Sequence, residues 1–342
     1  MDVTTIEWTL TIAVTVGVLL FDVVVIARDP REPTLKECAI ALVFYIGAAV
    51  AFGVWTLVHH GHDYGVQFFA GWLTEYSLSA DNLFVFIVLM TTLKVPRRYQ
   101  QEALLVGIIL ALVFRGVFIA LGYTLIDTFS FVFYVFGAFL VYTAAKLLGD
   151  YARDEDDHAE ESRIVRFAQQ RLRTGTRYEG LRLWYHENGA RVFSPILIVI
   201  VALGFTDLLF ALDSIPAIFG ITQEPYLVLA ANVFALMGLR QLYFLLGGLL
   251  KRLVYLSLGL SFILAFIGVK LVLHALHENE LPFVNGGEPV DVPEISSLLS
   301  LAVILTTLVV TTVASLLRTS GMPAEVVPSD DLDETPGSDW RH

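Results

Sequence analysis

The 342-residue chain has little charge and a single cysteine, Cys38. One cysteine allows neither a disulfide scaffold nor a cage of thiolates around a metal. Charged residues make up 16% of the chain, where a soluble domain carries about 25%. Basic residues are outnumbered 34 to 22 by acidic ones, and the net charge of −12 argues against nucleic acid as a partner. We find no phosphate-binding glycine loop, catalytic triad or zinc-enzyme motif, and expect neither an enzyme nor a prosthetic group.

Apolar residues are what the chain has in excess. They make up 56% of it, and the mean hydropathy is +0.68, which is too high for a soluble globular domain or a disordered chain. A helix needs about 20 apolar residues to cross a bilayer core of about 30 Å. Runs of this kind lie at 6–26, 36–58, 67–93, 100–122, 126–148, 192–222, 225–248, 253–276 and 297–317. They predict an all-α polytopic membrane protein with nine transmembrane helices, in one domain over residues 1–320.

The basic residues predict how the chain is oriented. If the N-terminus is outside, every Lys and Arg at the helix ends or in the loops falls on the inner side, as the positive-inside rule requires. We therefore predict an outer N-terminus and a cytoplasmic C-terminus. The one long inner loop is 149–191, and the acidic, proline-containing tail 321–342 is predicted to be disordered.

Two of the predicted helices carry the same polar string. The third reads TEYSLSADN from Thr74 and the sixth reads TDLLFALDS from Thr206, so the Thr and both acids recur at a constant offset. The helices that follow each string carry lone cations at matching places: Arg115 and Arg240, then Lys146 and Lys270. Helices 3–5 therefore resemble helices 6–8, and the predicted orientation makes this 3+3 repeat inverted, an architecture of secondary transporters with interrupted helices.

The acids of the two strings lie near the middle of their helices. A carboxylate there costs at least about 2.5 kcal/mol, so it must face a partner or a cavity. For Glu75 and Asp207 we weigh two roles equally, pairing with the four lone cations and a functional role. For Asp81 and Asp213 we favour an ion-binding role, in which the two converge on one ion.

Hard oxygen donors surround these two aspartates. Thr74 lies seven residues before Asp81 and therefore on the same helix face, and the sixth helix repeats this spacing. Pro216 has no N–H to donate to the carbonyl of Leu212, which leaves that oxygen free. The predicted ligands are Asp81, Asp213, Glu75, Asp207, Asn82, Ser214, Thr74, Thr206 and the carbonyl of Leu212. Two carboxylates with further oxygens suit magnesium, manganese or calcium.

The segments 75–86 (EYSLSADNLFVF) and 207–217 (DLLFALDSIPA) resemble the two signature segments of the TerC family of integral membrane proteins. The resemblance implies a multi-pass protein of the plasma (inner) membrane within a broad superfamily of cation exporters. Members are associated by name with tellurium resistance, some with manganese efflux, and plant relatives with thylakoid protein insertion. It also places the acidic signature residues of the family at Asp81 and Asp213, with Glu75 and Asp207 beside them.

We expect a secondary transporter that exports a hard divalent cation in exchange for protons, with manganese favoured by the resemblance over calcium and magnesium. The alternative is a partner in the insertion or assembly of membrane or secreted proteins. In that case the intramembrane acids are structural ion pairs and the loop 149–191 is the working surface. If the protein is a transporter, its expected partners are the lipid bilayer and the divalent cation. The sequence indicates no particular oligomeric state.

Overall fold

The computed structural model of the chain describes residues 1–28, 33–93, 95–129, 131–153, 183–187, 190–246, 253–279, 281 and 284–319. Within these ranges the helices are α1 (Thr5–Arg28), α2 (Leu35–His59), α3 (His62–Thr92), α4 (Arg97–Thr128), α5 (Val132–Arg153), α7 (Pro195–Phe219), α8 (Pro225–Leu236), α9 (Leu239–Leu246), α10 (Leu256–His277) and α11 (Ser297–Thr319). Helices occupy all nine predicted apolar runs, with α8 and α9 sharing one of them. The prediction of an all-helical membrane protein is confirmed at this level.

Among the described residues, seven helical segments are long and apolar enough to cross a membrane. They are α2, α4, α5, α7, the α8–α9 segment, α10 and α11. Of the other two, α1 contributes a shorter apolar stretch, 5–18, and α3 carries the polar string that begins at Thr74.

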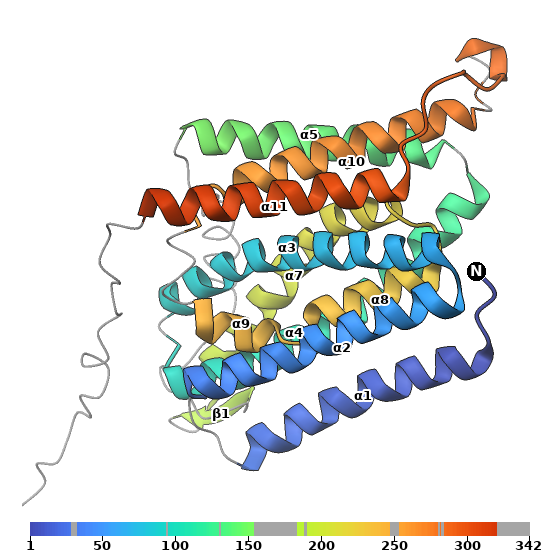
Figure 1. Cartoon of the computed structure of the whole chain (residues 1–342). Helices are drawn as coiled ribbons and strands as arrows, with labels where there is room; N and C mark the ends of the chain where they lie inside the picture. Colours follow the sequence, from blue (N-terminus) through green and yellow to red (C-terminus); the bar gives the residue numbers. More distant parts are fainter. Residues whose placement is uncertain are drawn as a thin grey trace, which may run out of the picture.

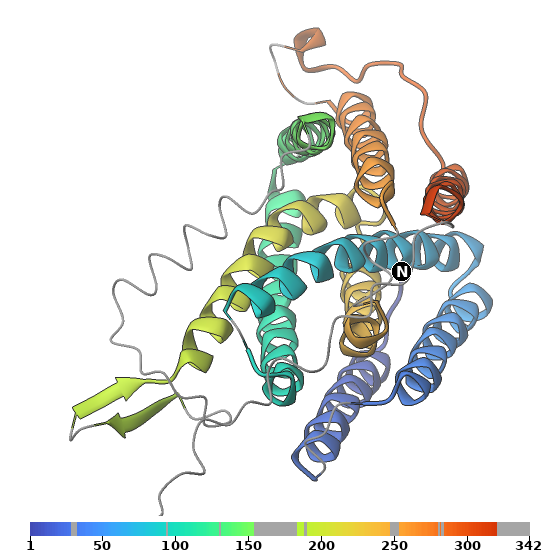
Figure 2. The same cartoon turned by 90° about the vertical axis from the view of Figure 1, so that its left-hand side faces the viewer.

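Most helices run side by side along one direction (Figure 1). The closest packing joins α5 to α10, α3 to α8, and α4 to α7. Viewed nearly end-on, α3 crosses the centre of the bundle, while α1 and α2 lie on the side away from α5 (Figure 2). Because α1 has few neighbours, most of its described side chains are exposed.

The buried apolar side chains form two clusters at different depths of the bundle. On α4 one cluster ends at Ala111 and the other begins at Ile119, and on α7 the corresponding limits are Leu203 and Ala211. Arg115 therefore lies on α4 between the two clusters. Asp207 has the matching place on α7.

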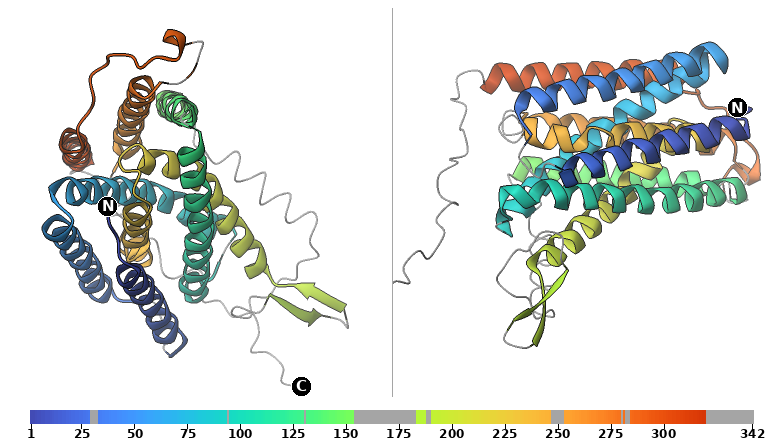
Figure 3. Two further views of the ribbon diagram at one scale, coloured as in Figure 1. Left: turned by 90° about the vertical axis from the view of Figure 1, so that its right-hand side faces the viewer. Right: turned by 90° about the horizontal axis from the view of Figure 1, so that it is seen from below.

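A short hairpin precedes α7 and departs from the all-α prediction. Strands β1 (Trp184–Glu187) and β2 (Ala190–Phe193) pair antiparallel, with Trp184 opposite Phe193. The hairpin projects sideways from the bundle (Figure 3). The predicted start of a helix at residue 192 is wrong because the strand continues to Phe193 and Pro195 fixes the first helical turn. The loop residues 154–182 and the tail 320–342 lie outside the described part of the chain.

Among the described helices, the interruption lies in the α8–α9 segment and not in α7, which contains Pro216. Helix α7 continues through Pro216 to Phe219. The interruption falls between α8 and α9, where Met237 has an extended ψ of 127° and Gly238 has a φ of +85°. This left-handed backbone favours glycine because it has no side chain. A Cβ at Gly238 would also lie 3.2 Å from side-chain atoms of Leu42 and Tyr45 on α2.

Candidate functional site

A single arginine joins the first acids of the two polar strings. Arg115 Nη1 on α4 donates to Glu75 Oε2 on α3 at 2.6 Å, and Nη2 donates to Asp207 Oδ1 on α7 at 3.4 Å. The side chains of Arg115, Glu75 and Asp207 are 1%, 0% and 4% exposed. The tertiary structure thus brings together two carboxylates that are far apart in the sequence, and we call these three residues the Arg115 cluster.

Gly204 lies at the contact between two helices of this cluster. It is on α7 and faces α4, and a Cβ there would make ordinary van der Waals contact with Leu110 at 3.4 Å and Phe114 at 3.8 Å. Asp207 follows Gly204 by three residues and Arg115 follows Phe114 directly, so this contact lies close to the longer of the two ion pairs.

The Arg115 cluster pairs two carboxyl groups with one guanidinium. Its formal charge is −1 when both carboxyl groups are ionised, in a buried position. Glu75 Oε1, Asp207 Oδ2 and Arg115 Nε have no hydrogen-bond partner among the described residues. These carboxylate oxygens are therefore free to accept from, or to coordinate, a further group.

Other buried polar groups lie on α3, α7 and α8. The hydroxyl of Ser79 on α3 and the amide of Asn232 on α8 are buried and lack a partner in the described residues. Ser214 on α7 is buried within hydrogen-bonding reach of Glu75, and Ser79 follows Glu75 by one helical turn. Carboxylate and hydroxyl oxygens are donors that suit a hard divalent cation.

The hydroxyls of the predicted threonine ligands point into the core. Thr74 is buried and its hydroxyl donates to the carbonyl of Ala70 at 2.9 Å, which leaves its oxygen lone pairs able to accept. Thr206 is buried as well. Asn82 is partly buried, whereas the side chain of Leu212 is 45% exposed on the outer face of α7.

The backbones of Asp81 and Asp213 belong to α3 and α7, but their side chains lie outside the described part of the structure. Their convergence on one ion therefore stays a prediction. Within the described ranges, no group of three or more His, Cys, Asp or Glu side chains is placed to hold a metal ion.

The four predicted charge-compensating residues have very different surroundings. Arg115 contacts both acids, as above. Arg240 is buried at the start of α9, in the wall of a small cavity that Gln241, Tyr45 and Val18 also line. Lys146 is exposed on α5 and Lys270 is partly buried on α10.

Sequence reasoning did not single out Ser79, Asn232 or Gln241. Each is a polar side chain buried in an apolar helix with an atom that lacks a partner in the described residues. Asn232 had a usable signal, since it is a lone amide in the apolar run 225–236. Ser79 and Gln241 gave no such signal in the sequence. Both lie next to charged or polar residues, so the sequence alone does not show whether they face the core or the surface.

The comparisons with known proteins agree with this architecture. Residues 60–321 match the model of the integral membrane protein TerC family. An uncharacterized membrane protein of Mycobacterium tuberculosis is 49% identical over 311 residues, which is 90% of this chain and 78% of that protein. The chloroplastic thylakoid membrane protein TERC of Arabidopsis thaliana is 38% identical over 244 residues, 71% of this chain and 63% of that protein.

A third relative is the putative membrane-bound redox modulator Alx of Salmonella typhi, which is 39% identical over 208 residues, 61% of this chain and 64% of that protein. No solved structure is significantly similar to the chain. The family model covers most of the chain, including both polar strings and the Arg115 cluster. The chain therefore belongs to the TerC family of integral membrane proteins.

Proposed function

We infer that this protein is a secondary transporter that exports a hard divalent cation, manganese before calcium or magnesium, in exchange for protons. The observation that carries the proposal is the Arg115 cluster, because it joins one carboxylate from each polar string in the buried middle of the bundle. In this proposal the ion binds to the acids of the two strings, with Asp81 and Asp213 as its main ligands. Glu75 and Asp207 act as further ligands or carry protons.

The packing of the helices supports an inverted repeat. In the proposed repeat, α3 corresponds to α7, α4 to the α8–α9 segment, and α5 to α10. If each helix is replaced by its counterpart in the other half, the contact between α3 and α8 becomes the contact between α7 and α4. Both contacts are extensive. The contacts between α5 and α10 and between α3 and α7 map onto themselves. Rocking of one half against the other about the central acids is the motion that such repeats provide.

Arg115 has a defined part in this mechanism. It neutralises one of the two buried carboxylates and so keeps Glu75 and Asp207 together when no ion is bound. Arg240 has the corresponding place in the second half and would take over this task in the oppositely facing state. An ion that binds among the acids competes with Arg115 for their carboxylate oxygens. This competition couples ion binding to movement of α4, the helix that carries Arg115.

The alternative function is insertion or assembly of other membrane or exported proteins. The complete burial of the Arg115–Glu75 pair favours it, since buried ion pairs also occur as structural elements. The name of the Alx relatives suggests a redox role. A thiol–disulfide mechanism needs a second thiol, and Cys38 is the single cysteine of this chain.

Ion flux into proteoliposomes tests the proposal. The purified protein is reconstituted, and uptake of manganese, calcium and magnesium is measured with and without a proton gradient, for the wild type and for Asp213→Asn. We expect gradient-dependent manganese uptake that Asp213→Asn abolishes while the variant stays folded. If no divalent cation moves with the wild-type protein, and deletion of residues 160–185 removes activity in cells, the assembly function replaces the transport function.

A further inference from the structure

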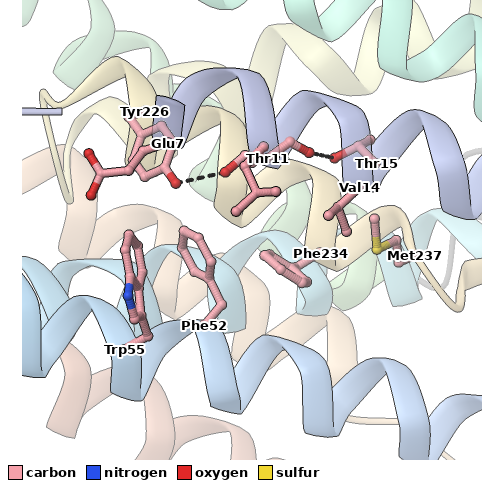
Figure 4. Close-up of a pocket in the computed structure, with 10 residues that line it drawn as sticks. Glu7, Thr11, Val14, Thr15, Phe52, Trp55, Tyr226, Phe234 and Met237 are labelled. Atoms are coloured by element: carbon pink, nitrogen blue, oxygen red, sulfur yellow. Dashed lines mark hydrogen bonds between the residues drawn. The ribbon is translucent and has the colours of Figure 1, made fainter. Parts of the chain in front are cut away.

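A groove separates α1 from the rest of the bundle (Figure 4). Its volume is about 280 Å³ and it lies between α1, α2 and α8. The walls are mainly apolar and aromatic, formed by Leu10, Val14, Phe52, Trp55, Phe234 and Met237. None of the lining residues belongs to the Arg115 cluster, so the groove is a separate feature from the proposed ion site.

The groove has the length of one lipid leaflet. Along α8 it extends from Tyr226 to Met237, and eleven residues of helix span about 16 Å. Half of a hydrocarbon core of about 30 Å is nearly the same length. Glu7, Trp55 and Tyr226 lie at one end and Met237 at the other (Figure 4), so the groove runs from the membrane surface toward the midplane.

The hydroxyl groups inside the groove already have partners. Thr11 and Tyr226 share a hydrogen bond of 2.7 Å, and the Thr15 hydroxyl donates to the carbonyl of Thr11 at 2.7 Å. The occupant therefore needs no polar groups along its length. Water would gain little in such a site, whereas a hydrocarbon chain fits it.

The surface end of the groove carries a carboxylate. Glu7 accepts hydrogen bonds from the backbone and hydroxyl of Thr4, and its Oε1 lies 3.0 Å from His60 Nε2. A carboxylate at this place attracts a headgroup that bears an ammonium. It repels a headgroup whose only charge is its phosphate.

We propose that the groove binds one acyl chain of an aminophospholipid, such as phosphatidylethanolamine, from the leaflet on the side where α1 begins. The chain lies between α1 and α8, and the ammonium of the headgroup contacts Glu7. Its methyl end reaches Met237, at which α8 is interrupted. The lipid thus fills the space between α1 and the helix pair that carries the break.

Native mass spectrometry of the delipidated full-length protein tests this proposal. Phosphatidylethanolamine or phosphatidylglycerol is added back to the wild type, to Val14→Trp and to Val16→Trp. Both valines are about half exposed on α1, but Val14 lines the groove and Val16 does not. We expect one retained phosphatidylethanolamine on the wild type and on Val16→Trp, and a loss of affinity of about tenfold or more for Val14→Trp.

Two further measurements keep the proposal falsifiable. Glu7→Gln should remove the preference for phosphatidylethanolamine over phosphatidylglycerol. The fluorescence of Trp55 is the part of the wild-type signal that is lost in Trp55→Phe. Lipids with brominated acyl chains should quench it, and this measurement does not depend on the folding of Val14→Trp. Equal retention by the wild type and a folded Val14→Trp, a wild-type preference for phosphatidylglycerol, or a Trp55 signal that brominated lipids leave unchanged would each overturn the proposal.

Discussion

The two segments that carry Arg115 and Arg240, α4 and α8–α9, differ in structure. Helix α4 is continuous and holds Arg115 between two carboxylates, whereas the other segment breaks at Met237 and Gly238, just before Arg240. Aligning Arg115 with Arg240 places Val113 of α4 at the position of Gly238. The interrupted segment thus has a glycine at its interruption, where the continuous helix α4 has a valine.

Removal of Arg115 should have the largest effect. Arg115→Gln leaves Glu75 and Asp207 buried without a cation, and breaking such a pair costs about 3–5 kcal/mol. We expect that loss in the free energy of unfolding, measured by thermal unfolding in detergent. The triple variant Arg115→Gln, Glu75→Gln, Asp207→Asn should regain part of it, because it also removes the uncompensated charges. An unchanged melting temperature for Arg115→Gln would contradict the structure of the cluster.

The two carboxylates of the cluster should differ in their effect. Arg115 lies 2.6 Å from Glu75 and 3.4 Å from Asp207, and a short hydrogen bond to a charged group contributes about 1.5–3 kcal/mol. Glu75→Gln should therefore destabilise the protein by about 2 kcal/mol, and Asp207→Asn by less. The same thermal assay measures both, and the reverse order would mean that Asp207 is the main partner.

Arg240 should matter for transport even though Arg115 already joins the acids. If the second half takes over in the oppositely facing state, Arg240→Gln raises the barrier to that state, and about 1.4 kcal/mol lowers the rate tenfold. Manganese uptake by proteoliposomes measures this rate. Uptake equal to that of the wild type would show that the two arginines do not alternate.

The break itself should respond to single substitutions by about 1 kcal/mol. Gly238→Ala forces a side chain into a left-handed conformation and against Leu42 and Tyr45, whereas Val113→Gly weakens a continuous helix. Val113→Ala is the matched control and should change stability by less than about 0.5 kcal/mol. If Gly238→Ala is as well tolerated as Val113→Ala, the glycine does not determine the break.

Membrane insertion and the helical segments could be predicted because they depend on local composition. A run of about 20 apolar residues in a bilayer has few stable states other than a helix, and each predicted run contains helix. The two polar strings were also evident, since carboxylates in apolar helices are rare. The family resemblance came from the same strings and is confirmed by the match over residues 60–321.

The position of the break between α8 and α9 could not be predicted from the sequence. A proline inside α7 leaves one carbonyl without its donor, yet the neighbouring helices hold the rest of the helix in place, so Pro216 does not interrupt it. Gly238 allows a left-handed backbone without requiring it. Its conformation follows from packing against α2, which no local pattern encodes.

The sequence by itself determined that this chain is a membrane-embedded helical protein with two acidic strings, because hydrophobic length and intramembrane charge are properties of each segment alone. Only the tertiary structure decided that Arg115 meets both Glu75 and Asp207. Helix crossing and side-chain reach bring these three residues together and leave the groove beneath α1. These are contacts between distant segments, and they depend on how whole helices pack.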